Sequence, residues 1–153
     1  MDAKKIAERF MDDLWNRHNL AAADELFAED CVTHQLRSAP GPVPAAPRRP
    51  ADVKRELAGW FAAFPDIALE LEERVAEGDV VVSRYLMRGT HTGEWLGVPA
   101  TGKPICVRMA HTIRVRDGKI VEDWLLAEWH GMLEQLGLLP SLAEALARPP
   151  KKA

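Results

Sequence analysis

The sequence lacks most features of a membrane-bound or secreted protein. It has only two cysteines in 153 residues, Cys31 and Cys106, which are too few for a disulfide framework. Its first residues have neither the basic start nor the apolar run of a signal peptide. No apolar run approaches the ~20 residues of a membrane span. We therefore expect a cytoplasmic protein that has no membrane as a partner.

Positive charge is not in excess, and metal-binding patterns are absent. The chain has 20 Lys and Arg residues against 23 Asp and Glu residues. A nucleic-acid-binding surface needs a concentrated basic face, and only the end of the chain, from Arg148 to Lys152, is locally basic. The five histidines, the two cysteines and the acidic residues show no metal-ligand spacing. We expect neither nucleic acid nor a metal ion as a partner.

With 47% hydrophobic residues, a chain of this length can bury one core, so we expect a single compact domain. Apolar residues at steps of three and four predict an amphipathic helix from about Ala3 to Trp15 and another from about Ala51, which Pro65 ends. A short helix is predicted over residues 21–28 and a brief strand over residues 32–35. Residues 38–50 hold five of the eleven prolines and predict a surface loop, either a lid or rim of a site or a plain connector.

The second half of the chain changes to the period of two that is typical of strands. Alternation begins at Ile67, and turn residues at Gly78-Asp79 and Asp117-Gly118 divide the later strands. Helices followed by a long antiparallel sheet predict an α+β fold, with the helices on one face of a strongly curved sheet. The segment from Gly131 onwards is expected to close one end as short helices.

The last two strands hold a histidine and a carboxylate that can share one face. The odd positions of residues 105–115 are apolar except for His111. If Asp117-Gly118 forms a two-residue type I′ turn, His111 faces Trp124, and these two side chains share the concave face with Glu128. A G1 bulge at Gly118 would instead shift the register by one residue and place Trp124 and Glu128 on the other face.

These positions supply the candidate site. Glu128 is the candidate general base, because an apolar cone would desolvate its ionised form and raise its pKa; the alternative is a rim glutamate paired with an arginine. His111 would hydrogen-bond a substrate carbonyl or share a proton with Glu128, or would be a satisfied core histidine. Other side chains are expected in the core and as the lining of a pocket for a flat substrate. They are Trp15, His34, Trp60, Phe64, Tyr85, Met109 and Trp124.

An ordered string of short motifs, spanning roughly Ala3 to Gly137, resembles the SnoaL-like polyketide cyclase (ester cyclase) family. The motifs are Phe64-Pro65-Asp66, Gly78-Asp79, Arg88-Gly89-Thr90-His91-Thr92-Gly93-Glu94, Leu96-Gly97-Val98-Pro99, Thr101-Gly102-Lys103, Asp117-Gly118-Lys119-Ile120-Val121-Glu122, Trp124 and Gln135-Leu136-Gly137. The resemblance implies the cone-shaped fold of the nuclear transport factor 2-like proteins, with a deep apolar pocket between a mostly antiparallel sheet and N-terminal helices.

The same resemblance implies a chemistry. It implies intramolecular aldol cyclisation of a hydrophobic, polyketide-like ester without cofactor or metal, and a homo-oligomer, either a dimer or a tetramer. In that family an aspartate four residues after the tryptophan serves as general base, and the matching position here is Glu128, a carboxylate longer by one methylene. We expect residues 1–140 to form the SnoaL-like domain and residues 141–153 to form a C-terminal helix and a basic tail.

Two further function classes stay open on the sequence. Hydration, dehydration or isomerisation would use the same base beside a polarised oxygen. Replacement of the family aspartate by Glu128 is also compatible with a non-catalytic module that binds a small hydrophobic ligand. A purely structural dimerisation domain is a third possibility, which a sealed cavity would support.

Overall fold

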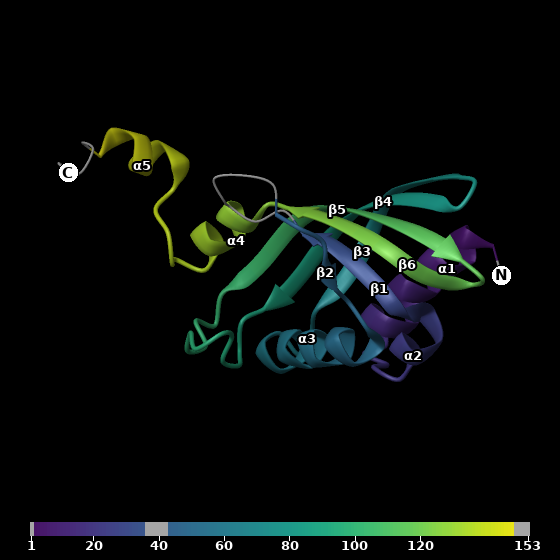
Figure 1. Ribbon diagram of the computed structural model, residues 1–153. Coiled ribbons are helices and arrows are strands. Elements are labelled where there is room, and N and C mark those ends of the chain that lie inside the picture. Colours follow the sequence, from purple (N-terminus) through teal and green to yellow (C-terminus); the bar gives the residue numbers. More distant parts are fainter. Residues whose placement is uncertain (1, 36–42, 149–153) are drawn as a thin grey trace.

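The structure, a computed structural model, describes residues 2–35 and 43–148 (Figure 1). Helix α1 (Ala3–Arg9) continues into the π-helical segment η1 (Phe10–Asn16), and α2 (Ala22–Leu26) and α3 (Pro50–Ala63) follow. The strands are β1 (Phe27–Gln35), β2 (Ala46–Pro47), β3 (Ala68–Glu77), β4 (Val80–Thr90), β5 (Pro104–Arg116) and β6 (Lys119–Ala127). Helices α4 (Trp129–Gln135) and α5 (Leu142–Ala147) end the described chain.

The predicted helices form where their apolar periodicity places them. The Asp2 carboxylate accepts from the Lys4 backbone N–H at 2.8 Å and caps α1. Ile6, Phe10 and Leu14 are buried along the continuous α1–η1 segment, as the steps of three and four predicted. The second half of this segment is π-helical, which the apolar spacing does not reveal. Helix α3 has proline at its first turn and ends at Ala63, just before the Phe64-Pro65 pair.

The six strands form one sheet in the order β2-β1-β6-β5-β4-β3. The β1–β6 pair is parallel, and the other four neighbouring pairs are antiparallel. Figure 1 shows α1, α2 and α3 gathered on one face of this twisted sheet, while α4 and α5 lie beyond one end of it. The predicted α+β class, with N-terminal helices against a mostly antiparallel sheet, is confirmed.

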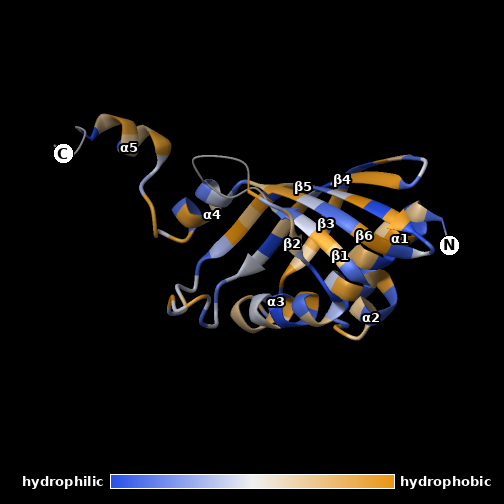
Figure 2. Cartoon of the chain, in the orientation of Figure 1, coloured by the Kyte–Doolittle hydropathy of each residue, from blue (hydrophilic) through white to orange (hydrophobic). Residues whose placement is uncertain are grey.

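The core lies between the helices and the inner face of the sheet. Burial alternates along β4 and β5 with the period of two. Figure 2 shows hydrophobic stretches in orange and hydrophilic ones in blue along the sheet. Tyr85, Met87, Val107 and Ile113 are inner residues that are almost completely buried. His111 belongs to the same inner row and is also buried.

The β5–β6 hairpin turns as predicted but then changes register. Asp117 and Gly118 both have positive φ, 50° and 73°, as a two-residue type I′ turn requires, and Val115 pairs with Ile120. Val121 is then an extra residue on β6, since Arg114 pairs with Glu122. Beyond this bulge every β6 side chain points to the face opposite to the one predicted. The predicted pairing of His111 with Trp124 is therefore wrong, because His111 lies opposite Leu125.

Part of the proline-rich segment and the predicted basic tail fall outside the described residues. Residues 36–42 and 149–153 are not described, and these include Lys151 and Lys152. Residues 43–47 are exposed, as expected of a surface loop, but Ala46–Pro47 pairs with β1 as a short strand. Arg48 is buried, although the predicted surface loop would have left it exposed. No helix within the described ranges is long and apolar enough to cross a bilayer.

Candidate active site

A pocket of about 980 Å³ opens between η1, α3 and the inner face of the sheet. Its walls are mainly aromatic and aliphatic, with Met109 and Leu125 supplied by the sheet. Four of the five tryptophans line it, from η1, α3, the loop after β4, and α4; they are Trp15, Trp60, Trp95 and Trp129. A cavity of this size and composition suits an organic molecule with a large apolar surface.

Trp60 is the centre of the aromatic wall. The centroid of its ring lies 5.2 Å from that of Trp95 and 6.0 Å from that of Trp129, with which it is stacked at 25°. The centroid of the Trp15 ring lies 6.5 Å from that of Trp60. These separations fall within the range of favourable aromatic contacts. The wall is therefore a set of aromatic rings that pack against one another.

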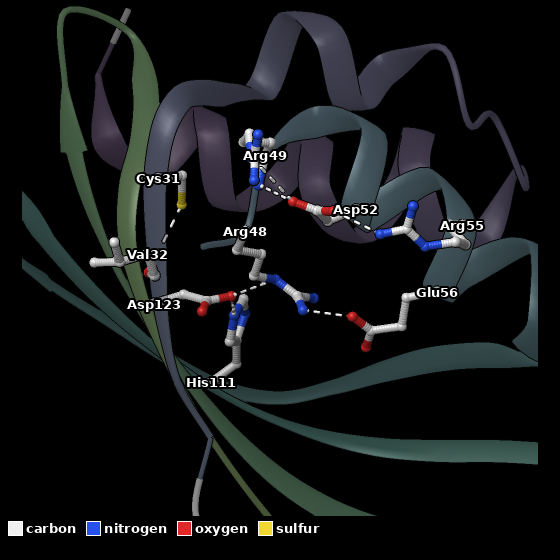
Figure 3. Close-up of polar contacts among 9 residues, drawn as sticks. All are labelled: Cys31, Val32, Arg48, Arg49, Asp52, Arg55, Glu56, His111 and Asp123. Atoms are coloured by element: carbon white, nitrogen blue, oxygen red, sulfur yellow. Dashed lines mark hydrogen bonds and ion pairs between the residues drawn. The ribbon is translucent and has the colours of Figure 1, made fainter. Parts of the chain in front are cut away.

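The polar end of the pocket is a buried group of three residues, Arg48, His111 and Asp123 (Figure 3). One oxygen of Asp123, Oδ2, lies 3.1 Å from His111 Nε2 and 3.0 Å from Arg48 Nε. The Asp123 and His111 side chains are 1% and 4% exposed. His111 and Arg48 line the pocket, while Asp123 stands behind them.

The tautomer of His111 follows from its partner. An ionised carboxylate only accepts hydrogen bonds, so Nε2 carries the proton and donates it to Asp123. In the neutral ring Nδ1 then holds the lone pair. Nδ1 has no hydrogen-bond partner among the side chains that the structure describes. It is also not among their fully buried polar atoms that lack a partner, so it is accessible. The His111 ring itself is held by Phe10, whose centroid lies 4.6 Å away.

Asp123 remains ionised despite its burial. Desolvation is the largest influence and raises the pKa of its carboxyl, but the hydrogen bond from His111 and the charges of His111 and Arg48 outweigh it. The net effect lowers the pKa of Asp123 below its ordinary value. The carboxylate is thus an anion at neutral pH and can orient the imidazole and stabilise the imidazolium form.

Arg48 is fixed from several directions. Its backbone N–H donates to the Cys31 carbonyl at 2.7 Å, which ties it to β1. Its Nη1 donates to Glu56 Oε2 on α3 at 2.5 Å, and its guanidinium lies over the Phe27 ring, 5.9 Å from the centroid. Farther out on α3, Asp52 and Arg55 form an ion pair at 2.6 Å at the pocket rim.

The structure brings four of the nine predicted site residues to the pocket. His111, Trp15, Trp60 and Met109 line it. Two others lie in the core behind the lining. Phe64 is fully buried with its ring 5.6 Å from that of Trp60, and Tyr85 is buried with its hydroxyl accepting from Arg74 Nη2 at 3.2 Å.

His34 and Trp124 lie on the opposite face of the sheet. Their rings are stacked 4.8 Å apart at 7°, and His34 Nε2 lies 2.8 Å from Glu122 Oε1. His34 follows Thr33, which does line the pocket, so strand alternation directs it away. Trp124 is directed away by the bulge at Val121. Their predicted placement in the pocket is wrong.

Glu128 is also outside the pocket, contrary to the prediction. Its side chain is exposed, and its Oε2 accepts from the Arg108 backbone N–H at 3.4 Å. The cause is the same one-residue bulge, which exchanges the two faces of β6. A side chain that does not line the pocket lacks the proximity to a substrate that the predicted role as general base requires.

The sequence reasoning missed Asp123 and Arg48. Asp123 directly precedes Trp124, so the shifted register that moves Trp124 outwards moves Asp123 inwards. An acidic residue between Glu122 and Trp124 on a half-buried strand carried no stronger signal than its neighbours. Arg48 belongs to the proline-rich segment, whose composition predicted an exposed loop, so nothing in the sequence indicated that its side chain is buried. Within the described residues, no group of three or more His, Cys, Asp or Glu side chains is arranged to hold a metal ion.

Fold and site together define a class: an α+β cone with an aromatic pocket that ends in a buried histidine–carboxylate pair. The sequence model described as SnoaL-like polyketide cyclase matches residues 5–136. The chain therefore belongs to the SnoaL-like polyketide cyclase family, which confirms the resemblance read from its motifs.

Individual relatives agree with this assignment. The chain is 36% identical over 86 residues to nogalonic acid methyl ester cyclase of Streptomyces nogalater, an alignment that covers 54% of this chain and 63% of that protein. The match thus spans less than two thirds of that relative. Among solved structures, IdmH, a putative polyketide cyclase from Streptomyces antibioticus, is 34% identical with a TM-score of 0.72, covering 90% of this chain and 99% of IdmH. AclR, a putative hydroxylase from Streptomyces galilaeus, is 31% identical with a TM-score of 0.74, over 90% of this chain and 97% of AclR.

Proposed function

We propose that this chain catalyses the cofactor-independent intramolecular aldol cyclisation of a flat, neutral polyketide ester, with His111 as the general base. The observation that carries the proposal is the His111 imidazole. Its Nε2 is anchored by a buried carboxylate, and its Nδ1 has no partner among the described side chains at the end of an apolar pocket of about 980 Å³. The relatives that are named as methyl ester cyclases support an ester substrate.

The proton path uses one imidazole for both steps. His111 Nδ1 removes the proton from the carbon next to a carbonyl, so that a C–H bond breaks, an N–H bond forms and the electron pair passes to the carbonyl oxygen. The enolate carbon then attacks a second carbonyl of the same molecule and closes the ring. The imidazolium returns its proton to the resulting alkoxide. Asp123 stabilises the imidazolium between the two steps, because its carboxylate lies 3.1 Å from Nε2.

The rest of the pocket supports this reaction. The tryptophan faces around Trp60 suit a fused-ring substrate, and stacking would hold its flexible side chain near His111. Two pairs of charged side chains at the pocket, Arg48–Glu56 and Arg55–Asp52, neutralise each other. A neutral ester avoids the cost of bringing an unpaired carboxylate next to Glu56 and Asp123.

Ring closure of nogalonic acid methyl ester by purified variants tests the proposal. We expect His111→Gln to lower kcat/KM by about 10²–10⁴-fold, the usual contribution of a general base. We expect Glu128→Gln, which changes an exposed side chain, to retain wild-type turnover. Absorbance changes and chromatographic retention report product, and thermal denaturation checks that both variants fold. Loss of turnover in Glu128→Gln with normal turnover in His111→Gln would contradict the assignment.

A binding module is the second candidate, and the same assay separates it. If a flat ester raised the melting temperature of the wild-type protein but was never converted, the pocket would serve binding alone. Conversion to a product of different mass would indicate hydration or dehydration, because cyclisation leaves the mass unchanged.

A further inference from the structure

Arg48 is a cation at the polar end of the pocket to which the base reaction above gives no role. Its side chain is only 7% exposed, and it lines the pocket. A guanidinium has five N–H donors spread over three nitrogens. The Nε atom of Arg48 lies 3.0 Å from Asp123, and Nη1 donates to Glu56. Nη2 has no partner among the described residues and is not among their fully buried polar atoms that lack a partner, so it is accessible.

We propose that Arg48 is a second catalytic residue, whose Nη2 donates to the substrate oxygen on which negative charge develops. This inference rests on the proposed function, because it assigns the group that stabilises the enolate formed by His111. It also adds a requirement on the substrate: a carbonyl oxygen must reach Arg48 while the adjacent C–H reaches His111.

The shared anchor makes this geometry possible. His111 Nε2 and Arg48 Nε lie within 3.1 Å of the same oxygen, Asp123 Oδ2, so the two side chains are close neighbours (Figure 3). In an enolisation, the carbon that loses the proton and the oxygen that gains the charge are both bonded to the same carbonyl carbon. A base and a cation that are held beside the same carboxylate oxygen can therefore act on one carbonyl unit.

The fixed position of Arg48 suits it to this role. Phe27, Glu56 and Asp123 hold the side chain before any ligand arrives, and the hydrogen bond to the Cys31 carbonyl holds the backbone. A donor that does not have to reorganise stabilises developing charge better than water does, and its effect is larger in an apolar pocket. Asp123 and Glu56 also balance the charge of Arg48, so the site does not bind an anion tightly before the reaction begins.

The first test compares turnover of the same ester by Arg48→Gln, Arg48→Lys and a matched control, Arg49→Gln. Arg49 is the adjacent arginine, but its side chain is 58% exposed and does not line the pocket. We expect Arg48→Gln to lower kcat by about 10²–10³-fold, the usual loss for an oxyanion donor, with a much smaller change in KM. Arg48→Lys keeps the positive charge but not the planar guanidinium group, so its kcat should lie between those of Arg48→Gln and the wild-type protein. Folded Arg48 variants with wild-type kcat would overturn the proposal.

The second test does not depend on turnover. 2-Naphthol is a flat phenol whose absorbance reports its ionisation, so the bound form imitates an enolate oxygen. We expect the ratio of ionised to neutral bound 2-naphthol to fall about tenfold in Arg48→Gln, the loss of one hydrogen bond to a charged oxygen, and to stay unchanged in Arg49→Gln. An equal ratio in wild type and Arg48→Gln would overturn the role of Arg48 and leave His111 as base intact. If the wild-type protein does not bind 2-naphthol, the pocket assignment fails, and both proposals fail with it.

Discussion

Asp123 shows how one side chain joins the chemistry of the pocket to the stability of the fold. Its carboxylate is 1% exposed and holds side chains from two other segments, His111 on β5 and Arg48 after β2. Removing one partner of a buried ion pair leaves the other charge without compensation, which typically costs about 3–5 kcal/mol. The residue that orients the proposed base is therefore also a structural residue, and its variants must be examined for folding as well as for turnover.

The lowered pKa of Asp123 predicts a pH dependence of stability. A carboxyl whose pKa is lower in the folded protein than in the unfolded chain stabilises the fold above its ordinary pKa of about 3.9. This contribution is lost as the pH falls below the ordinary pKa and through the lowered pKa of Asp123 in the folded protein. We expect Asp123→Asn to unfold more easily than wild type by about 3 kcal/mol at pH 7, and the difference to shrink towards pH 3. Urea denaturation at a series of pH values measures it.

Asp24→Asn provides the control for that experiment. Asp24 pairs with Lys54 at 2.6 Å, and the side chains of Asp24 and Lys54 are 57% and 36% exposed. Exposed pairs contribute about 0–1 kcal/mol, so this variant should follow the wild-type curve at every pH. A constant difference between Asp123→Asn and wild type down to pH 3 would show that the carboxylate is not the source of the acid sensitivity.

At the scale of elements, the loop after β4 is attached to the end of α3 and carries one ring of the aromatic wall. The backbone N–H groups of Thr92 and Gly93 both donate to the Ala63 carbonyl at 3.0 Å. The loop approaches so closely that a Cβ on Gly93 would lie 2.1 Å from the Ala62 carbonyl oxygen. This contact places Trp95 against Trp60, so the glycine serves both packing and the pocket.

Two glycine-to-alanine variants should shift stability in opposite directions. Gly93→Ala forces the loop away from rigid helix backbone and should destabilise the protein by about 1–3 kcal/mol, as overpacking does. Gly59→Ala, in the interior of α3 with open space around the added methyl group, should stabilise it by up to about 1 kcal/mol through helix propensity. Thermal denaturation compares them. Equal effects of the two substitutions would contradict the close approach at Gly93.

At the scale of the whole molecule, the helices cover one face of the sheet and leave the other open (Figure 1). Val75 and Val82, a cross-strand pair on β3 and β4, are 60% and 43% exposed, and Leu126 on β6 is 56% exposed. Exposed apolar side chains on an open face favour contact with another protein surface. This arrangement supports the expected homo-oligomer, which stays a prediction.

We expect light scattering at micromolar concentration to give a mass of at least twice the 17.0 kDa of one chain. Leu126→Lys places a charge on the open face and should shift the distribution towards the monomer, while Leu142→Lys on α5, which buries no residue, should not. A monomeric wild-type protein would contradict the prediction.

The sequence by itself determined the class of fold and most of the elements. The apolar periods of α1–η1 and α3, the stop at Pro65 and the type I′ turn at Asp117-Gly118 are local properties, set by residues within a few positions of each other. The motif string between Phe64 and Gly137 was sufficient for the family. His111, Trp15, Trp60 and Met109 were found because inner strand and helix positions could be counted from their own segments.

Only the tertiary structure decided which carboxylate of β6 points to the inner face of the sheet, behind the pocket wall. After the extra residue at Val121, the alternate rows of β6 read Glu122, Trp124, Leu126 or Asp123, Leu125, Ala127, and neither row is plainly the apolar one. Local periodicity cannot choose between them. The choice depends on partners far apart in the chain, since Asp123 meets Arg48 from the proline-rich segment and His111 from β5. A buried charge is stable only where such partners converge, and that convergence exists only in the folded chain.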